Sequence, residues 1–329
     1  MKIAVLGDGG WGTALAILLQ SKGFDVSLWG AFADNIGSLE RDRENKKFLP
    51  GVKIPKNIKL TCDAYIACED AGLVVLAVPS RFLRAVLVKN KDALKQARSG
   101  FVSVIKGLEE KSLKRMSEVV VEILGEIDLA VLSGPSIAPE VAREIPTAVV
   151  ASSEDEILAR KVRDVFRTEK FRVYTNDDVI GVELGGALKN IIAIASGISD
   201  GLGFGVNTKA AILTRGLLEI TRLGVAMGAS AETFKGLSGL GDLVTTCVSK
   251  VGRNRSFGES IGSGNNPEDV LKKSAAEIEG VWTSRAALSL GRKYNIDLPI
   301  TQEVYSVVFE KKSPFSAVNE LMMREPKEE

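Results

Sequence analysis

The chain has 329 residues, of which 45% are apolar and 26% charged, and its formal net charge is +1. This composition is typical of a globular protein, and the length allows about two domains. The near-neutral charge gives no indication of a nucleic-acid partner. The sequence contains no histidine, so any general acid or base must be Lys, Asp, Glu, Tyr or Cys.

Targeting and membrane-spanning patterns are the next classes to consider. The first residues enter a strand pattern directly, and no apolar run reaches the roughly 18 residues that a membrane helix needs. We therefore expect neither a signal peptide nor an integral membrane segment. Cys62, Cys68 and Cys247 fit no metal or redox spacing. We expect no metal site and a cytoplasmic location.

A glycine-rich turn lies at the start of the chain. Lys2–Leu6 is a short apolar run typical of a buried parallel strand, and a helical pattern follows at residues 13–23. Between them, Gly7, Gly9 and Gly12 form G-x-G-x-x-G. In a dinucleotide site these glycines permit a tight turn, approach of the pyrophosphate and close helix packing. The alternative is a turn of the same shape that binds no ligand.

The second strand pattern, at residues 24–29, leaves the cofactor type open. An acid usually ends this strand and binds the ribose 2′-hydroxyl. Here Gly30, Ala31 and Phe32 follow, so neither an acid nor an arginine stands at that position. Asp34 is a substitute acid or the cap of the next helix. Residues 36–47 then predict a helix, and residues 48–51 a turn.

Alternating strand and helix patterns continue to about residue 177 and predict a mostly parallel sheet of about eight strands. Beyond that point the patterns are almost wholly helical. The predicted fold is therefore α/β, with an N-terminal Rossmann-type domain at 1–177 and an all-α C-terminal domain at 178–329. Further strands are expected at 59–61, 73–78, 101–105, 130–132, 147–151 and 171–174, and further helices at 63–68, 81–97, 155–166, 207–227, 275–290 and 300–309.

The helix predicted at residues 183–205 has two distinct faces. Leu184, Leu188, Ile191, Ala195 and Ile198 form an apolar face, while Lys189 and Asn190 share the other with small residues such as Gly186, Ala193 and Gly197. We interpret the small residues as room for a substrate beside Lys189. The alternative is a helix packed against a neighbour, with Lys189 extending to solvent.

Several other polar residues stand where a ligand could bind. Lys106 follows a predicted strand, at the sheet edge where open α/β folds bind ligands, unless it is a solvated turn lysine. Residues 133–140 form a Gly-Pro turn with serine hydroxyls. Asp242 either caps a helix or reaches the site. Gly252, Arg253 and Asn254 suit a phosphate, although a basic surface turn has the same composition.

Taken together, these segments resemble bacterial NAD(P)-dependent glycerol-3-phosphate dehydrogenase. The resemblance spans nearly the whole chain and is carried by KIAVLGDGGWGTALA, SVIKGLE, LSGPSIAPEVAREIPTAV, GALKNIIAIASGISDGLGFG, GLSGLGDLVTTC and GRNRSFG. It implies reversible reduction of dihydroxyacetone phosphate to sn-glycerol 3-phosphate with NAD or NADP as cofactor. It also implies a supply of glycerol 3-phosphate for glycerophospholipid synthesis in the cytoplasm, and a possible homodimer.

The resemblance also implies roles for individual positions. Lys189 matches the catalytic acid/base. The matching substrate-binding positions are Lys106, Gly134, Ser136, Lys189, Asn190, Asp242, Thr246, Gly252, Arg253 and Asn254. The matching cofactor-binding positions are Gly7, Gly9, Gly10, Trp11, Gly12, Phe32, Phe48, Lys106, Ala138, Arg253 and Glu279.

Two departures from the family pattern concern the cofactor. Gly10 stands where the family commonly has serine, and Ala31-Phe32 replaces a pair that is often His-Arg. The second change removes a cation that would favour the 2′-phosphate of NADP. Two other functions fit many of the same residues: a related two-domain hydroxy-acid dehydrogenase, and an inert dinucleotide sensor. Retention of Lys189 argues against the sensor, because a sensor needs no proton donor.

Overall fold

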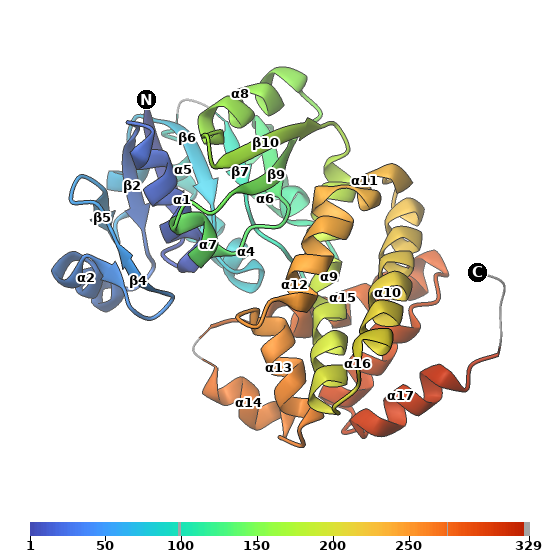
Figure 1. Ribbon diagram of the computed structural model, residues 1–329. Helices are drawn as coiled ribbons and strands as arrows, with labels where there is room; N and C mark the ends of the chain where they lie inside the picture. The colour runs from blue at the N-terminus through green and yellow to red at the C-terminus, as the bar shows by residue number, and fades with distance from the viewer. Residues whose placement is uncertain (98–99, 275, 326–329) are drawn as a thin grey trace.

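The computed structural model describes residues 1–97, 100–274 and 276–325. It has an N-terminal α/β domain with a Rossmann-like sheet, followed by a domain built of helices (Figure 1). The predicted fold class is therefore confirmed. The long helix α9 (Val179–Gly201) leads from the sheet into the helical domain.

The central sheet has eight strands, which agrees with the predicted number of about eight, and their order is β10-β9-β8-β7-β6-β1-β2-β5. All neighbours are parallel except β8 and β9, which are antiparallel. The strands are β1 (Lys2–Leu6), β2 (Asp25–Trp29), β5 (Lys59–Thr61), β6 (Ala71–Leu76), β7 (Phe101–Ser103), β8 (Leu129–Ser133), β9 (Thr147–Ser152) and β10 (Phe171–Asn176).

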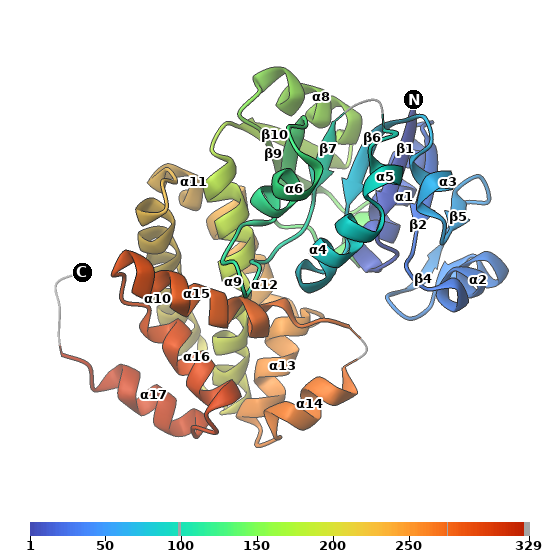
Figure 2. The ribbon, with the colours of Figure 1, turned by 180° about the vertical axis from the view of Figure 1, so that it is seen from behind.

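Side chains of β1 alternate between two cores because successive residues of a strand point to opposite faces. Ile3 and Val5 join the core beneath α1 and α8, whereas Ala4 and Leu6 join the core beneath α4 and α6. Figures 1 and 2 show these two helical layers from opposite sides. The first layer holds α1 (Gly10–Ser21), α7 (Ala138–Ala142) and α8 (Glu156–Phe166), and the second holds α3 (Ala64–Cys68), α4 (Ser80–Lys89), α5 (Lys91–Leu94) and α6 (Met116–Leu124).

The helix predicted at 36–47 is confirmed as far as Asp42 and not beyond it, and the turn predicted at 48–51 is wrong because a strand covers residues 49–53. The helix ends early because Arg43 adopts a left-handed conformation with φ 46°. A hairpin follows, with its turn at residues 46–48. Tertiary hydrogen bonds of the buried Asn45 hold this hairpin, and no local pattern reveals them. The elements found are α2 (Ala33–Asp42) and the antiparallel pair β3 (Glu44–Asn45) and β4 (Leu49–Lys53).

Other helix boundaries also differ from prediction. The helix expected at 81–97 is broken at Asn90, whose side chain donates to the carbonyl of Val86 at 2.8 Å. Helix α6 has no predicted counterpart, and α7 begins at Ala138 inside the turn predicted at 133–140. The helix expected at 275–290 begins at Glu279; residue 275 itself lies outside the described residues.

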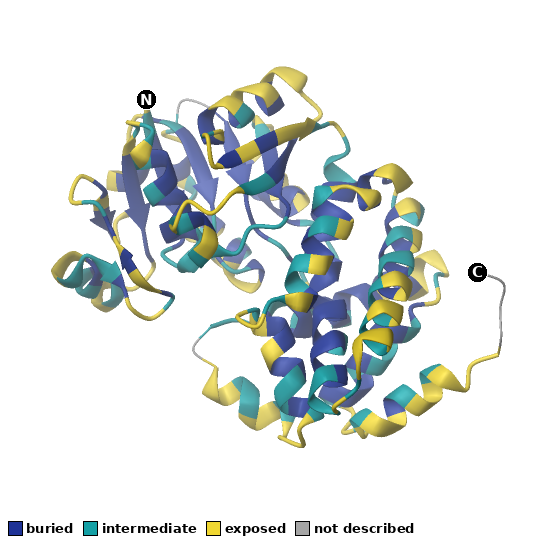
Figure 3. Ribbon diagram, in the orientation of Figure 1, coloured by how far each residue is buried: buried dark blue, intermediate teal, exposed yellow. Residues whose placement is uncertain are grey.

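Helix α9 is the centre of the second domain. It is long and apolar enough to cross a membrane by length and composition, but 83% of its most apolar window is buried within the protein (Figure 3). That burial is typical of a core helix. Around it lie α10 (Val206–Ala226), α11 (Ala231–Lys235), a π-helical turn η1 (Leu237–Gly241), α12 (Asp242–Val248), α13 (Arg253–Gly262), α14 (Pro267–Lys273), α15 (Glu279–Tyr294), α16 (Pro299–Phe309) and α17 (Pro314–Met322).

A buried carboxylate on α10 caps the N-terminus of α16. Glu219 accepts backbone N–H groups from Ile300 at 2.6 Å and Thr301 at 3.2 Å, and also the Thr301 hydroxyl at 3.2 Å. These donors favour the ionised form, but burial outweighs them and raises the pKa of Glu219 to about 7. The folded protein therefore binds a proton at Glu219 more tightly than the unfolded chain does.

We expect the stability conferred by Glu219 to depend on pH. Its folded pKa lies above its unfolded value, so stability is fully present below about pH 4.5 and is lost as pH rises through about 7. Compared with Glu219→Gln, the wild type should lose roughly 3 kcal/mol of unfolding free energy between pH 5 and 8. Urea unfolding at several pH values measures this. A pH-independent difference would contradict it, and the exposed Glu154→Gln is the control.

Candidate functional site

The glycine-rich turn (residues 7–12) has the geometry that a dinucleotide requires. Gly7 has φ +128°, a conformation that favours glycine, and a side chain at Gly12 would collide with the carbonyl oxygen of Gly7. A side chain at Gly9, by contrast, would meet nothing within 4 Å. The turn is therefore tight and closely packed on the protein side, and open where a pyrophosphate would approach.

The N-terminus of α1 adds hydrogen-bond donors to this turn. Gly9 is its N-cap and provides no side-chain cap, so first-turn N–H groups are available to an anion. The indole N–H of Trp11 is buried without a partner. These features fit a dinucleotide. At Gly10, a Cβ would lie 2.5 Å from the carbonyl oxygen of Phe48, so the hairpin occupies the space that a serine would need.

Lys189 lies in a buried polar cluster with Asp242 and Thr246. Its ammonium Nζ lies 2.7 Å from Asp242 Oδ1 and donates a second hydrogen bond to Thr246 Oγ1. Lys189 is 5% exposed. The alternative of a lysine extending to solvent is therefore wrong. Asp242 points into this cluster and caps no helix, which settles that alternative too.

Lys106 joins the same cluster from the N-terminal domain. It follows β7, and its Nζ lies 2.7 Å from Asp242 Oδ2, so one carboxylate binds both lysines. It also donates to the carbonyl oxygen of Gly134 at 2.9 Å and to Ser136 Oγ at 3.5 Å. Lys106 is thus no solvated turn lysine, and the two domains meet at Asp242.

Burial lowers the pKa of Lys189 to about 8. Asp242 opposes this change, and the positive charge of Lys106 adds to it. Lys106 is brought next to Lys189 by their shared partner Asp242. A lysine with a pKa of about 8 can donate a proton as the ammonium and accept one as the neutral amine near neutral pH.

Close backbone packing fixes the position of this cluster. A Cβ at Gly185 would lie 2.6 Å from the carbonyl oxygen of Ser238, in the π-helical turn that precedes Asp242. A Cβ at Gly186 would lie 2.6 Å from Ser133 Oγ. Gly197, however, packs against the backbone of Arg255 on α13. The small residues near that end of α9 therefore serve helix packing, and the prediction that they leave substrate space is wrong there.

Asn190 and Asn254 form a second buried polar link beside the cluster. The Asn254 amide donates to Asn190 Oδ1 at 2.9 Å and accepts the backbone N–H of Gly280 at 2.9 Å. Asn190 also donates to the carbonyl oxygen of Lys106 at 3.3 Å. The Asn190–Asn254 link therefore joins α9, α13 and α15 to the loop that carries Lys106.

Arg253 stands outside these contacts. It is exposed at the start of α13, after the N-cap Gly252, and its guanidinium donates to the carbonyl oxygen of Glu277 at 3.1 Å. Among the described residues, no ion pair joins it to Asp242, the carboxylate of the lysine cluster. Its neighbour Asn254 hydrogen-bonds Asn190, so the predicted basic turn adjoins the cluster while the Arg253 guanidinium stays exposed.

Glu279 links the two domains beside the predicted cofactor crevice. It is the first residue of α15, and its carboxylate accepts the backbone N–H of Ser80 at 3.0 Å and the Ser80 hydroxyl. Burial raises the pKa of Glu279, and these hydrogen bonds oppose that change. Ser80 follows β6, so Glu279 reaches the same sheet edge as Lys106.

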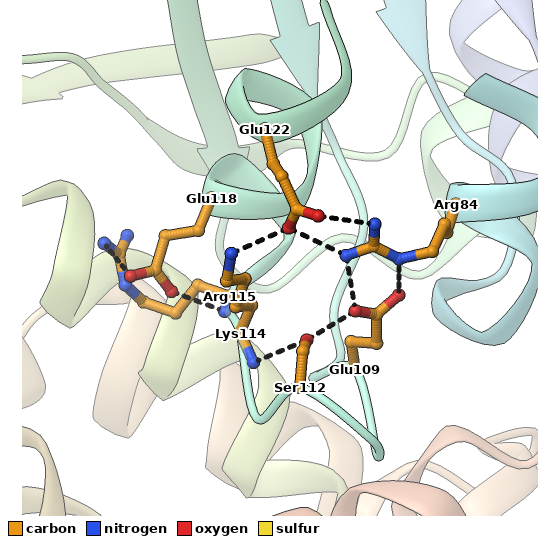
Figure 4. A network of polar contacts seen from close by, with 7 residues as sticks. All are labelled: Arg84, Glu109, Ser112, Lys114, Arg115, Glu118 and Glu122. Carbon is orange, nitrogen blue, oxygen red and sulfur yellow. Dashed lines mark hydrogen bonds and ion pairs between the residues drawn. The ribbon is translucent and has the colours of Figure 1, made fainter. Parts of the chain in front are cut away.

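The loop that carries Lys106 is also held by a network of charged side chains around Arg84 (Figure 4). Arg84 on α4 binds Glu109 through two hydrogen bonds of 2.7 and 2.8 Å and Glu122 through two of 2.8 and 2.9 Å. Lys114 binds Glu122 at 2.7 Å. Bidentate guanidinium–carboxylate pairs hold geometry well, so Arg84 fastens this loop to α4 and α6.

The remaining predicted cofactor positions lie apart from the lysine cluster. Phe32 is 74% exposed at the N-cap of α2, and Phe48 lies in the hairpin turn under the Lys47 ammonium. Ala138 begins α7 and packs beside Leu49. Sequence reasoning missed Asn45, which donates to the backbone carbonyl of Asp8 inside the glycine-rich turn. An asparagine in a charged segment gives no signal of that contact.

Comparison with known proteins agrees over the whole chain. The family model for the NAD-dependent glycerol-3-phosphate dehydrogenase N-terminus matches residues 2–159, and the model for the C-terminus matches residues 178–319. A glycerol-3-phosphate dehydrogenase (NAD(P)+) of Pelotomaculum thermopropionicum is 51% identical over 98% of this chain and 93% of its own length. One from Thermoanaerobacter sp. is 50% identical over 100% and 99%.

A solved structure extends this similarity to the fold. The crystal structure of glycerol-3-phosphate dehydrogenase from Coxiella burnetii superposes with a TM-score of 0.94 at 40% identity, covering 98% of this chain and 99% of that one. Sequence and structure agree from the glycine-rich turn to the helical domain. The chain belongs to the NAD-dependent glycerol-3-phosphate dehydrogenase family.

Proposed function

We propose that this enzyme reversibly reduces dihydroxyacetone phosphate to sn-glycerol 3-phosphate with NAD(P)H, with Lys189 as the general acid/base. The observation that carries the proposal is the buried Lys189 ammonium, whose Nζ lies 2.7 Å from Asp242 Oδ1. Asp242 also binds Lys106, which lies at the sheet edge where open α/β folds bind ligands, and the glycine-rich turn belongs to the same sheet. The bound nicotinamide supplies the hydride. The chain's own residues must then bind the substrate and move one proton.

Lys189 has the properties that the proton transfer needs. As the carbonyl accepts hydride, negative charge develops on its oxygen, and the Lys189 ammonium stabilises this charge before donating its proton. Its pKa of about 8 makes the donation favourable and lets the neutral amine accept the proton in the reverse direction. Asp242 holds the ammonium in place, and Thr246 accepts its second hydrogen bond.

The other predicted substrate residues are proposed to hold the phosphate and hydroxyl groups. Arg253 offers an accessible guanidinium fork, and Asn254 offers amide hydrogens beside it. Gly134 and Ser136 surround Lys106 on the sheet side. These groups would fix the carbonyl against the cofactor, and such positioning contributes strongly to catalysis. The substrate set is completed by Asn190 and Gly252.

One assay separates this function from the two alternatives. NADH and NADPH oxidation is followed with dihydroxyacetone phosphate and, separately, with a keto acid such as ketopantoate. We expect turnover with dihydroxyacetone phosphate. Turnover confined to the keto acid would favour a hydroxy-acid dehydrogenase, and cofactor binding without turnover would favour a sensor.

Arg253→Ala is expected to raise the KM for dihydroxyacetone phosphate by about 10- to 100-fold, with a smaller effect on kcat, because charge-assisted hydrogen bonds are worth roughly 1.5–3 kcal/mol. Steady-state kinetics measures both constants. Arg222→Ala removes an exposed arginine of α10 and is the matched control. An unchanged KM would make Arg253 a surface arginine without a substrate role.

We also propose domain limits, an assembly and a location. The domain boundary at 177/178 is supported by Asp178, which caps α9 at the start of the helical core. A homodimer is supported by family resemblance alone, and light scattering after size-exclusion chromatography tests it. Cytoplasmic location is supported by the free state of Cys62, Cys68 and Cys247, since structural disulfides are typical of oxidising compartments.

A further inference from the structure

The end of β2 lacks the acid that usually binds the adenosine ribose. In dinucleotide folds an Asp or Glu there accepts the ribose 2′-hydroxyl, and it disfavours the 2′-phosphate of NADP. In this chain Gly30 follows β2, and the exposed residues after it carry no charge until Asp34. Asp34 lies in the first turn of α2. The sequence alone therefore left the cofactor preference open.

A carboxylate from the glycine-rich turn reaches this position instead. The half-buried Asp8 lies against Gly30, where an added Cβ would be 2.5 Å from the Asp8 carboxyl carbon. Only a residue without a side chain at position 30 leaves room for it. Asn35 on α2 donates to Asp8 Oδ2 at 2.5 Å, and it is the one side-chain donor to this carboxylate among the described residues.

The backbone around Asp8 is also held in place. Asn45 donates to the carbonyl oxygen of Asp8 at 2.8 Å and to Thr13 Oγ1 at 2.8 Å. Gly7 N–H donates to the carbonyl oxygen of Trp29, the last residue of β2, at 2.9 Å. The glycine-rich turn and the end of β2 are thus held in a fixed relative position. The Asp8 carboxylate has a defined position beside the strand end.

We propose that Asp8 takes the role of the missing strand-end acid and makes this enzyme prefer NAD(H) to NADP(H). This inference rests on the proposed dinucleotide site. Asp8 would accept the ribose 2′-hydroxyl of NADH, whereas the 2′-phosphate of NADPH would bring a like charge against it. Asn35 cannot offset that repulsion because its amide is neutral.

Direct binding tests the proposal without relying on turnover. Protein fluorescence titrations give the Kd of NADH and of NADPH for the wild type, Asp8→Asn and Asp34→Asn. We expect the wild type to bind NADH at least ten-fold more tightly. Asp8→Asn should reduce this ratio about ten-fold, mainly by tighter NADPH binding, because the like charge beside the 2′-phosphate is removed. Asp34→Asn, in the exposed first turn of α2, should leave the ratio unchanged.

Three results would overturn the proposal. Equal wild-type affinity for both cofactors would remove any preference to explain. Equal weakening of both cofactors by Asp8→Asn would make Asp8 a structural residue of the turn. A changed ratio in Asp34→Asn alone would assign the role to that residue. Because binding is measured without substrate, these outcomes can be interpreted even if the enzyme does not reduce dihydroxyacetone phosphate.

Discussion

Lys189→Met is expected to lower kcat for dihydroxyacetone phosphate reduction by about 10³- to 10⁴-fold, because the variant lacks both the proton donor and the charge that stabilises the alkoxide. Methionine keeps the length of the side chain in its buried position. Cofactor affinity should change little, since Lys189 lies in the helical domain away from the glycine-rich turn. Steady-state kinetics and NADH titration measure the two effects.

A matched control is a second lysine–aspartate pair that also involves α9. Lys209 on α10 binds Asp200 on α9 at 2.8 Å, outside the cluster of Lys189 and Asp242. Lys209→Met should therefore reduce stability without a comparable loss of kcat. Near-normal turnover of Lys189→Met would remove Lys189 from the mechanism.

The pH dependence of wild-type kcat/KM is a second test of the role of Lys189. Burial lowers the pKa of its ammonium to about 8, and reduction requires the protonated form. The kcat/KM for reduction should therefore fall as pH rises through about 8, while that for glycerol 3-phosphate oxidation should rise over the same range.

The parts of the fold that sequence predicted well are those specified by local pattern. The tight turn at Gly7 and the close helix packing at Gly12 were predicted correctly, because backbone sterics at both positions leave glycine as the one residue that fits. The order of strands and helices followed from apolar periodicity. Lys189 was selected because the chain lacks histidine and because its helix resembles a known family.

The parts that sequence missed depend on contacts between distant residues. Asn45 holds the hairpin that replaces the predicted end of a helix, by hydrogen bonding to Asp8 and Thr13, more than thirty positions away. No single-sequence pattern encodes that choice. The sequence did not decide whether Asp242 caps a helix or reaches the site, because a carboxylate suits either role. The fold decides it by bringing Lys106 and Lys189 to Asp242. Tertiary partners decide such residues.

Asp242→Asn should change the pH profile as well as the rate. The Asp242 carboxylate raises the pKa of Lys189 against the effect of burial. Without that charge, the Lys189 pKa falls below about 8, and less of the lysine is protonated at neutral pH. The falling limb of the reduction profile should therefore move to lower pH. At pH 8 we expect kcat to drop by about 100-fold or more, with partial recovery in acid.

The same change should also destabilise the fold. Removing one partner of a buried ion pair costs about 3–5 kcal/mol, and here two ammonium groups lose their shared counter-charge. Asp200→Asn is the matched control because Asp200 also lies between two cations, Lys209 and Arg255. It should lower stability and leave the pH limb in place. If the falling limb of the reduction profile stayed at the wild-type pH in Asp242→Asn, the group that titrates in the reaction would not be Lys189.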